Sequence, residues 1–385
     1  MKIALVSPYD YPYPGGVTQH ISYLDKHFRE LGHQVEIIAP CAGEAPERLA
    51  DNVVVTTSRV ISIPFAGSKA RIPYSPAVYW RLKSALQGQH FDVVHAHEPL
   101  TLPVPLCALR HSQSVNVGTF HAYRDTHRIY QYGRRVFQPF FDKLHGKIAV
   151  SEAARDTVAR YFGGEFVIIP NGIDVERFGG DHVSPLEHYT DGRPNILFVG
   201  RLEPRKGFRY LIRAFPYVKE EFPQARLIVV GAYLKKDKAR YLRYARRHRL
   251  TGVKFVGHVS DEELPRYYRT CDVFCAPSIG FESFGIVLLE AMAAGKPIVA
   301  CNIPGYRDLL NDEKEGLLAE PKNEKALAEA IVRVLKNPAL QRRMGEQGRL
   351  KASQYSWREV ALQVLDFYRQ LLEREKGAKP GKGST

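Results

Sequence analysis

Long apolar runs are missing from this sequence. No stretch approaches the roughly 18–20 consecutive apolar residues that a membrane-spanning helix requires. The apolar N-terminal residues 2–6 stop at Ser7-Pro8, short of the length and the small-residue cleavage site of a secretory signal. We therefore expect a cytoplasmic chain with neither a spanning helix nor a secretory leader.

Cysteine is scarce, with 5 among 385 residues, and the five are scattered. Cys271 and Cys275 are four residues apart, but no histidine or further cysteine clusters beside them, which disfavours a zinc site. Buried, reduced thiols are typical of cytoplasmic proteins. We predict no metal site.

Acidic residues are outnumbered, 41 against 55 basic ones, so the formal net charge is +14. Such an excess favours an anionic partner: nucleic acid, acidic lipid or a phosphorylated substrate. No zinc-finger, RNP or helix-turn-helix signature is present, and we expect no nucleic-acid partner. Fifteen Lys and Arg against four Asp and Glu lie from Arg201 to Arg249. The tail 377–385 is rich in Gly, Lys and Ser and is predicted to be disordered.

Both halves of the chain open with a short apolar run followed by helical spacing. In the first half, residues 3–6 lead to Gly15-Gly16, a predicted helix over 17–31 and a strand over 35–39. The second half repeats this plan with a strand over 195–199, a loop, a helix over about 208–219 and a strand over 226–231. This alternation predicts parallel sheets covered by helices.

Further strands are predicted at 91–95, 148–149, 253–256, 273–275 and 297–300. The fold class is thus α/β, with two doubly wound, Rossmann-like domains at 1–175 and 190–357, joined through a Gly- and Pro-rich segment at 170–194. One α/β domain with an unrelated appendage is the alternative. In such sheets, ligands bind at the carboxyl ends of the strands.

Gly15-Gly16, between a strand and a helix, would let a ligand approach the backbone and the helix N–H groups. A plain tight turn is an equally good interpretation, because neither a G-x-G-x-x-G fingerprint nor a phosphate loop is present. His121 ends another predicted strand, although a lone histidine is more often structural than catalytic.

The loop 200–207 carries Arg201, Arg205 and Lys206 just past a predicted strand. Cations there suit a diphosphate, whose negative charge grows as its bond to a sugar breaks. A solvated basic loop is the alternative.

The strongest pattern is GFESFGIVLLEAMAAG at 280–295. We predict a helix from about Ser283, with Glu282 at its mouth and Glu290 about two turns along. Such carboxylates can accept hydrogen bonds from sugar hydroxyls while the helix N-terminus faces a phosphate. The alternative is a helix cap at Glu282 and a solvated face at Glu290.

Taken together, these motifs resemble those of the retaining glycosyltransferases of family four, which have the two-domain GT-B fold. The likeness rests on residues 280–295, GRLEPRKG at 200–207, IPNGID at 169–174, SPY at 7–9, PGGV at 14–17 and AHEP at 96–99. It is closest to the phosphatidylinositol mannosyltransferases, which use GDP-mannose at the cytoplasmic membrane face. In that fold the last helix, 358–376 here, crosses back to the first domain and helps to set the closure hinge.

The resemblance implies a role for each motif residue. Arg201 and Lys206 would hold the diphosphate, which Gly16 would contact from the other domain. Glu290 would bind the ribose hydroxyls. Glu282 would bind the transferred sugar, which His121 would also approach. Front-face attack assisted by the donor phosphate needs no cofactor, metal or protein nucleophile. The implied donor-binding set is Gly15, Gly16, Arg201, Lys206, Glu282, Phe284, Gly285, Ile286 and Glu290, and the catalytic set is His121, Arg201, Lys206 and Glu282.

The acceptor side departs from the relatives' pattern. The resemblance implies that Tyr9, Gly67, Ser68 and Arg71 contact the acceptor, with Arg71 on a phosphate. The relatives carry Tyr-Asn before this stretch, and Phe65 and Ala66 here lack that hydroxyl and amide, which puts phosphatidylinositol in doubt. Residues 75–86 predict a helix that is either interfacial, on an anionic membrane, or part of the core.

We therefore expect a retaining hexosyltransferase that moves mannose from GDP-mannose to a phosphate-bearing or lipid acceptor such as phosphatidylinositol. A UDP-sugar-dependent transferase with another acceptor, or an inactive nucleotide-sugar-binding protein, is the alternative. The expected location is cytoplasmic and peripheral, at the inner face of the cell membrane.

Overall fold

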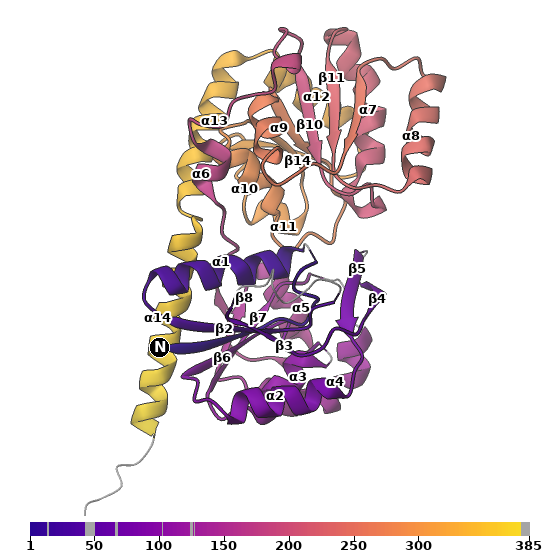
Figure 1. Cartoon of the computed structure of the whole chain (residues 1–385). Helices are drawn as coiled ribbons and strands as arrows, with labels where there is room; N and C mark the ends of the chain where they lie inside the picture. Colours follow the sequence, from indigo (N-terminus) through magenta and orange to yellow (C-terminus); the bar gives the residue numbers. More distant parts are fainter. Residues whose placement is uncertain are drawn as a thin grey trace, which may run out of the picture. The chain divides into compact units, whose positions relative to one another are not determined.

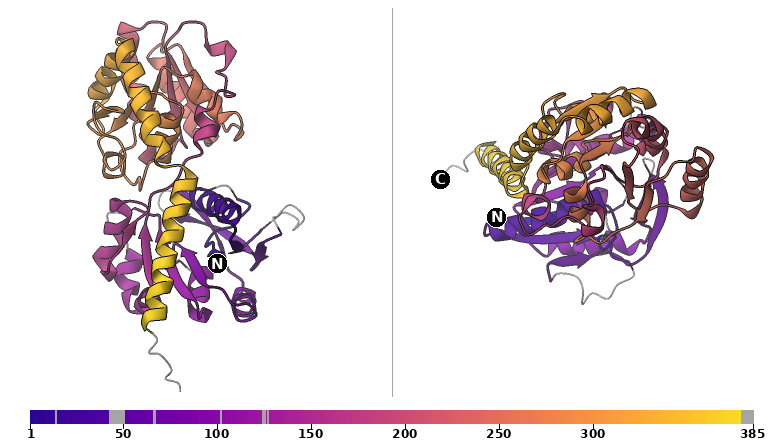
Figure 2. Two further views of the ribbon diagram at one scale, coloured as in Figure 1. Left: turned by 90° about the vertical axis from the view of Figure 1, so that its left-hand side faces the viewer. Right: turned by 90° about the horizontal axis from the view of Figure 1, so that it is seen from above.

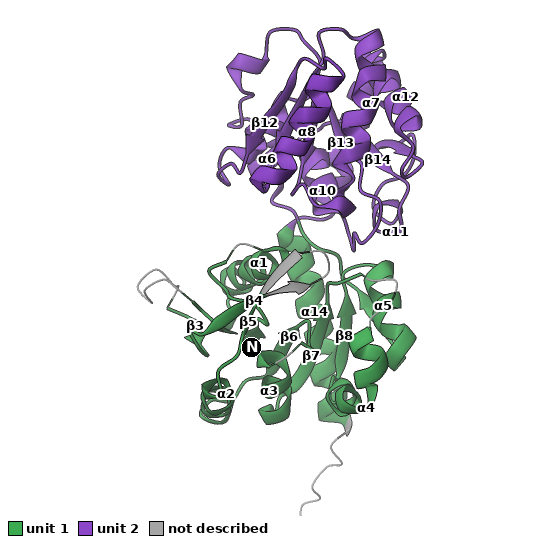
Figure 3. Ribbon diagram, turned by 90° about the vertical axis from the view of Figure 1, so that its right-hand side faces the viewer, with its two compact units in different colours: residues 1–172, 357–385 green, residues 173–356 purple. Residues whose placement is uncertain are grey.

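The computed structural model describes residues 1–13, 15–42, 51–65, 68–101, 103–123, 126 and 128–378. It divides into two compact units (Figure 3): unit 1 comprises Met1–Gly172 and Trp357–Thr385, and unit 2 comprises Ile173–Ser356. The N-terminal unit is thus completed by the C-terminal segment of the chain. Within the described ranges, no helix combines the length and the apolar character needed to span a bilayer.

Unit 1 is built on a seven-stranded parallel sheet with the order β3-β2-β1-β6-β7-β8-β9 (Figure 1). Parallel strands need crossover connections, and helices supply them. The strands are β1 (Lys2–Val6), β2 (Gln34–Ala39), β3 (Val53–Val55), β6 (Val93–His97), β7 (Val115–Phe120), β8 (Gly146–Ala149) and β9 (Val167–Ile168). The helices are α1 (Gly16–Glu30), α2 (Ala77–Gln87), α3 (Val104–His111), α4 (Arg128–Asp142), α5 (Glu152–Phe162) and α14 (Trp357–Ala378).

Alternating side chains of β1 supply the two cores of this sheet. Ile3 and Leu5 pack with α1 and α14 on one face, whereas Ala4 and Val6 pack with α2 and α3 on the other. The left view in Figure 2 shows α14, in yellow, running along the rest of unit 1. An antiparallel hairpin of β4 (Val60–Phe65) and β5 (Ser68–Pro73) forms a separate small sheet.

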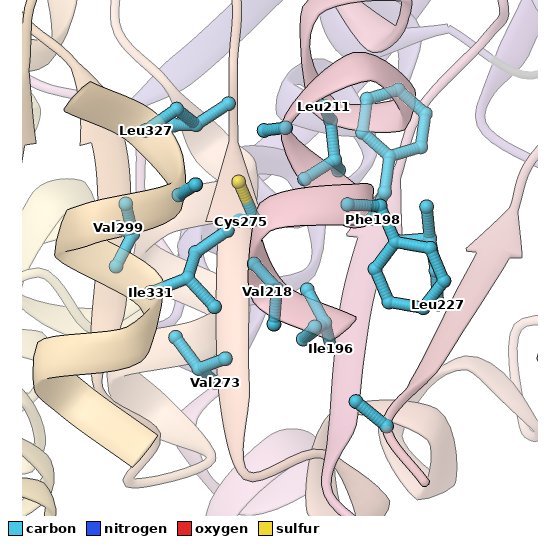
Figure 4. Close-up of a cluster of buried hydrophobic side chains, with 14 of the residues drawn as sticks. Ile196, Phe198, Leu211, Val218, Leu227, Val273, Cys275, Val299, Leu327 and Ile331 are labelled. Carbon is cyan, nitrogen blue, oxygen red and sulfur yellow. The ribbon is translucent and has the colours of Figure 1, made fainter. Parts of the chain in front are cut away.

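Unit 2 holds a six-stranded parallel sheet with the order β12-β11-β10-β13-β14-β15. Its strands are β10 (Asn195–Val199), β11 (Arg226–Val230), β12 (Val253–Gly257), β13 (Val273–Ala276), β14 (Ile298–Cys301) and β15 (Gly316–Ala319). The helices are α6 (Val175–Gly179), α7 (Phe208–Glu221), α8 (Lys235–Arg247), α9 (Leu264–Thr270), α10 (Ile286–Ala293), α11 (Pro304–Arg307), α12 (Glu324–Leu335) and α13 (Pro338–Ser353), with 3-10 turns η2 (Glu187–Tyr189) and η3 (Pro204–Lys206). Figure 4 shows Phe198, Val273 and Val299 of the sheet meeting Leu211 of α7 and Ile331 of α12.

The predicted α/β class with two doubly wound sheets is confirmed, but several boundaries were wrong. The strand predicted at 91–95 is β6, Val93–His97: Phe91 is buried, but pairing with β1 begins only at Val93. The disorder predicted from residue 377 is wrong for Gly377 and Ala378, which continue α14. Residues 379–385 lie outside the described part of the chain.

Candidate active site

Two loops meet at the centre of the unit 2 sheet. Strands β10 and β13 are neighbours, and the chain order of the strands reverses between them. In open α/β sheets this reversal marks the place where ligands bind, outside the carboxyl ends of the strands. Loop 200–207 follows β10 and loop 277–285 follows β13, so the two predicted motifs come from adjacent strand ends.

Gly207 fixes the packing of one loop on the other. Its φ is +69°, and a Cβ at this position would lie 1.7 Å from the carbonyl oxygen of Pro277. Only glycine fits so close an approach in this left-handed conformation. The backbone N–H of Ile279 donates to the carbonyl of Arg205 at 2.9 Å and ties the loops together.

This packing brings two cations to one carboxylate. Glu282 is 8% exposed, and its Oε1 lies 2.7 Å from the Arg205 guanidinium and 2.8 Å from Lys206 Nζ. Arg201 does not join them: it pairs with Glu203 at 3.2 Å, and Glu203 also holds Arg205 at 3.0 Å. The sequence predictions of Lys206 and Glu282 thus describe one cluster, and the structure adds Arg205 as the second direct partner of Glu282.

The helix predicted from Ser283 begins later, at Ile286. Gly285 precedes it with φ +91°, and Phe281 has φ +58°, so residues 281–285 form a loop rather than a helical turn. Phe284 is buried beneath this loop. Glu282 therefore stands outside α10, and the first turn of this helix carries no acidic residue. Its N–H groups are thus not opposed by a negative side chain of their own turn, as an anion site at a helix N-terminus requires.

Glu290 lies just over one turn into α10 and is partly exposed. The Tyr268 hydroxyl donates to Glu290 Oε2 at 2.6 Å. Burial raises the pKa of the Glu290 carboxyl to about 7, while Tyr268, Arg177 and Lys206 pull that pKa down. A carboxyl group among apolar neighbours needs a hydrogen-bond partner, and for Glu290 this partner is Tyr268 on α9. The spacing of residues in the sequence gave no sign of this pair.

In unit 1, His121 lies within a cluster of histidines. It follows β7 directly, and its Nε2 shares a hydrogen bond of 3.0 Å with Nδ1 of His97, the last residue of β6. His20 on α1 packs edge-on against both rings, and its Nδ1 lies 2.9 Å from Asn171 Oδ1. Burial lowers the pKa of His20 to about 4 and holds the pKa values of His97 and His121 well below 6.5, so these rings are neutral at pH 7.

Glu98 holds the backbone at His121 in place. Its Oε1 accepts from the backbone N–H groups of His121 and Ala122 at 2.7 and 2.8 Å, and its own N–H donates to Thr119 at 2.8 Å. Glu98 is 3% exposed and has φ +48°, a conformation uncommon for glutamate. Glu98 belongs to the AHEP motif at 96–99, but it was not among the predicted site residues.

The double glycine lies at the start of α1. Gly15 is the N-cap residue and Gly16 the first helical one, without a side-chain cap or an acid in the first turn. A Cβ added at Gly16 would meet nothing within 4 Å among the described atoms. The space on the Cβ side of Gly16 is therefore open among the described atoms, and a ligand can come close to the backbone there.

The structure describes only part of the predicted acceptor set. Arg71 Nε lies 3.1 Å from the buried carboxylate of Asp10, and its guanidinium stacks over Tyr13 at 5.0 Å. Tyr9 is the neighbour of Asp10 and forms reciprocal contacts with the Ser7 hydroxyl. Ser68 begins β5 opposite Phe65 in the hairpin, and nothing is described of its side chain. Gly67 lies outside the described residues, as does Ala66.

Helix α2 carries features of both interpretations considered for residues 75–86. Val78, Leu82 and Leu86 are buried against the unit 1 sheet. Trp80 is 66% exposed, with the Lys83 ammonium 5.7 Å from its ring. The helix is thus part of the core and also presents an aromatic and a cation to the outside.

Comparison with known proteins connects these two units to a family. Residues 14–177 match the family model described as Glycosyltransferase Family 4, and residues 187–351 match Glycosyl transferases group 1. The chain is 37% identical over 369 residues to a phosphatidyl-myo-inositol mannosyltransferase of Mycobacterium leprae, covering 96% of each chain. It is 34% identical to the protein of that name in Propionibacterium freudenreichii, covering 96% of this chain and 94% of the relative.

Solved structures agree on the fold. Sucrose-phosphate synthase from Thermosynechococcus elongatus superposes with a TM-score of 0.75 at 25% identity, covering 97% of this chain and 99% of that one. HepE from Anabaena, solved in complex with UDP, has a TM-score of 0.77 at 22% identity, covering 96% and 100%. The chain therefore belongs to the family-four glycosyltransferases and has the GT-B fold.

Proposed function

We propose that this glycosyltransferase transfers mannose from GDP-mannose, with retention of the anomeric configuration and without a metal ion, to phosphatidylinositol or a related phosphate-bearing lipid. The observation that supports the acceptor and the sugar most strongly is the 37% identity over nearly the whole length of the mycobacterial relative. The enzyme would act peripherally at the cytoplasmic face of the membrane, where such lipids are exposed.

Unit 2 would bind the donor by an exchange of partners. In the free protein, Lys206 and Arg205 are paired with Glu282. On arrival of the donor, these cations would turn toward the diphosphate, together with Arg201 and the first N–H groups of α10. Glu282 would then accept hydrogen bonds from hydroxyls of the transferred sugar.

The same groups would lower the barrier to bond cleavage. Negative charge grows on the diphosphate as the bond to the sugar breaks, and cations fixed at this position stabilise it. Glu290, as a carboxylate, would accept from both ribose hydroxyls. Gly15 and Gly16 would allow the diphosphate to approach the backbone of unit 1, and His121 would bind a hydroxyl near the reacting carbon. Catalysis would then consist of positioning and charge stabilisation.

On the acceptor side, Arg71 is the best-supported residue. Its present partner is the buried carboxylate of Asp10, so a phosphate would bind to a guanidinium whose position is already set. Tyr9 and Ser68 would lie beside that phosphate, and Gly67 would complete the set. The loss of the relatives' Tyr-Asn pair at Phe65-Ala66 would alter contacts to the ring that bears the phosphate.

The first experiment is transfer from labelled GDP-mannose to phosphatidylinositol in mixed micelles, with UDP-glucose and UDP-galactose run in parallel. We expect mannolipid from GDP-mannose alone, undiminished by a chelator, with the anomeric configuration of the donor as read by NMR. Lys206→Ala should reduce the rate about 100-fold, whereas Lys235→Ala on the exposed surface of α8 should not change it. Product from a UDP-sugar only, or no product with any phosphoinositide, would refute the proposed substrates.

A further inference from the structure

Three imidazole rings from three separate segments meet inside unit 1. They belong to His20 on α1, His97 at the end of β6 and His121 after β7. The ring centroids lie 5.3 Å apart for His20–His97, 4.8 Å for His20–His121 and 5.3 Å for His97–His121. One nitrogen from each ring can be chosen so that all three atoms lie within 4.8 Å of one another.

One imidazole nitrogen of this cluster lacks a partner among the described residues. His97 is 0% exposed, and its Nε2 is buried without a hydrogen-bond partner among the described residues. A buried polar atom left in this state costs free energy, and a bound ligand removes that cost. His20 and His121 are 3% and 8% exposed, so His121 is the ring by which a small ion could enter.

We propose that His20, His97 and His121 form a binding site for a zinc-like divalent transition-metal ion. Three neutral imidazoles with one open position are a ligand set that Zn²⁺ prefers, whereas Mg²⁺ and Ca²⁺ need oxygen ligands that this set does not contain. Tetrahedral bonds of about 2.0–2.1 Å place ligand nitrogens roughly 3.4 Å apart. The three rings would therefore have to approach each other by roughly an ångström from the observed spacing.

The surroundings favour such a movement. The amide of Asn171 contacts the His20 ring from behind, the kind of outer contact that orients a metal-ligating histidine. The hydrogen bond between Nδ1 of His97 and Nε2 of His121 leaves Nε2 of His97 and Nδ1 of His121 to bind the ion. The backbone of His121 is held by Glu98, so side-chain rotation, not backbone movement, would bring this ring to the ion.

Occupation of this site would inhibit the enzyme. This consequence rests on the role proposed above for His121 at the transferred sugar, because a ring bound to zinc can no longer contact a hydroxyl. The metal site itself does not depend on that role. Binding and inhibition therefore have to be measured separately.

The direct test is a Co²⁺ titration of the full-length chain, free of affinity tags and stripped with a chelator. We expect the intense visible absorption of a tetrahedral Co²⁺ ion at one equivalent, and its loss on addition of Zn²⁺. His20→Gln and His97→Gln should abolish the absorption and weaken Zn²⁺ binding by at least about tenfold. His90→Ala, which removes an exposed histidine of the same unit, should leave both unchanged.

X-ray absorption spectroscopy of the Zn²⁺-loaded wild type tests the site even if a glutamine variant fails to fold. This measurement counts the imidazole ligands on zinc and needs no substitution. Three imidazoles would support the site. Absorption that survives both glutamine variants, a six-coordinate Co²⁺ spectrum, or fewer than three imidazoles on zinc would overturn it. Zn²⁺ should also stop sugar transfer, reversibly by chelation. If no donor is turned over, the proposed function fails while the spectra still decide the metal site.

Discussion

Replacing Glu290 by glutamine should stabilise the folded protein, and more so at alkaline than at acidic pH. Burial raises the pKa of this carboxyl from its ordinary value of 4.5 to about 7. The folded chain therefore holds the proton more tightly than the unfolded chain. As pH rises from 4.5 to 7, the unfolded state ionises first, and the free energy of unfolding falls. Glutamine cannot ionise, so this loss disappears.

The magnitude follows from the same shift. A difference of about 2.5 in pKa corresponds to roughly 3 kcal/mol if it acts in full. Glu290 is partly exposed, and solvent screening reduces the effect to roughly 1–2 kcal/mol. For a unit of this size, each kcal/mol moves the unfolding temperature by about 2–4 °C. Glutamine can still accept from the Tyr268 hydroxyl, so the substitution removes the charge and keeps the hydrogen bond.

Calorimetry at pH 5 and pH 8 measures this directly. The unfolding temperature of Glu290→Gln minus that of the wild type should be larger at pH 8 by roughly 2–8 °C. Glu262→Gln, which neutralises an exposed acid of the same unit, should show no such difference. An equal shift for Glu290→Gln at both pH values would show that this carboxyl has an ordinary pKa and would refute the reasoning.

Three further predictions concern the residues that shape the two sites. Below pH 7 the wild type should bind GDP-mannose more weakly, because the Glu290 carboxylate becomes protonated. The Glu290→Gln variant should bind GDP-mannose weakly at every pH, and isothermal titration calorimetry measures both affinities. Gly207→Ala should lower the free energy of unfolding by at least about 3 kcal/mol, because the added Cβ would meet the Pro277 carbonyl at 1.7 Å. Gly192→Ala is the control: Gly192 also has a positive φ but lies in open space, so the substitution should lower the free energy of unfolding by only about 1 kcal/mol. Glu98→Gln should slow transfer about tenfold with a small change in unfolding temperature, and an unchanged rate would remove Glu98 from the positioning of His121.

The fold could be predicted because buried parallel strands leave a strong trace in sequence. Residues 196–199 and 227–230 are continuous apolar runs, and they belong to two strands of the unit 2 sheet, β10 and β11. Boundaries were less secure where a residue takes an unusual backbone conformation. The predicted start of α10 at Ser283 ignored Gly285, whose φ of +91° ends the loop two residues later.

The sequence predicted which motifs form the candidate site, but it did not predict which side chains pair with one another. Arg201, Arg205 and Lys206 are equivalent cations in the sequence, and only the turn at η3 and the glycine after it decide which of them reach Glu282. The hydrogen-bond partner of Glu290 could not be predicted from the sequence for a similar reason. Tyr268 belongs to a different helix, and nothing in its local sequence marks it as a hydrogen-bond donor to a carboxylate.

Strand order is the information that the sequence patterns lacked. Rules for metal sites look for ligands at short spacings, and His20, His97 and His121 are too far apart along the chain to satisfy them. Once β6 and β7 are known to be neighbours, with His97 paired to Thr119, the proximity of His97 and His121 follows, because both side chains lie at the same edge of the sheet. Adjacency of β10 and β13 explains the meeting of Lys206 and Glu282 in the same way. Lys206, Glu282 and His121 could be chosen as candidates from the sequence, whereas their neighbours could be identified only from the topology of the two sheets.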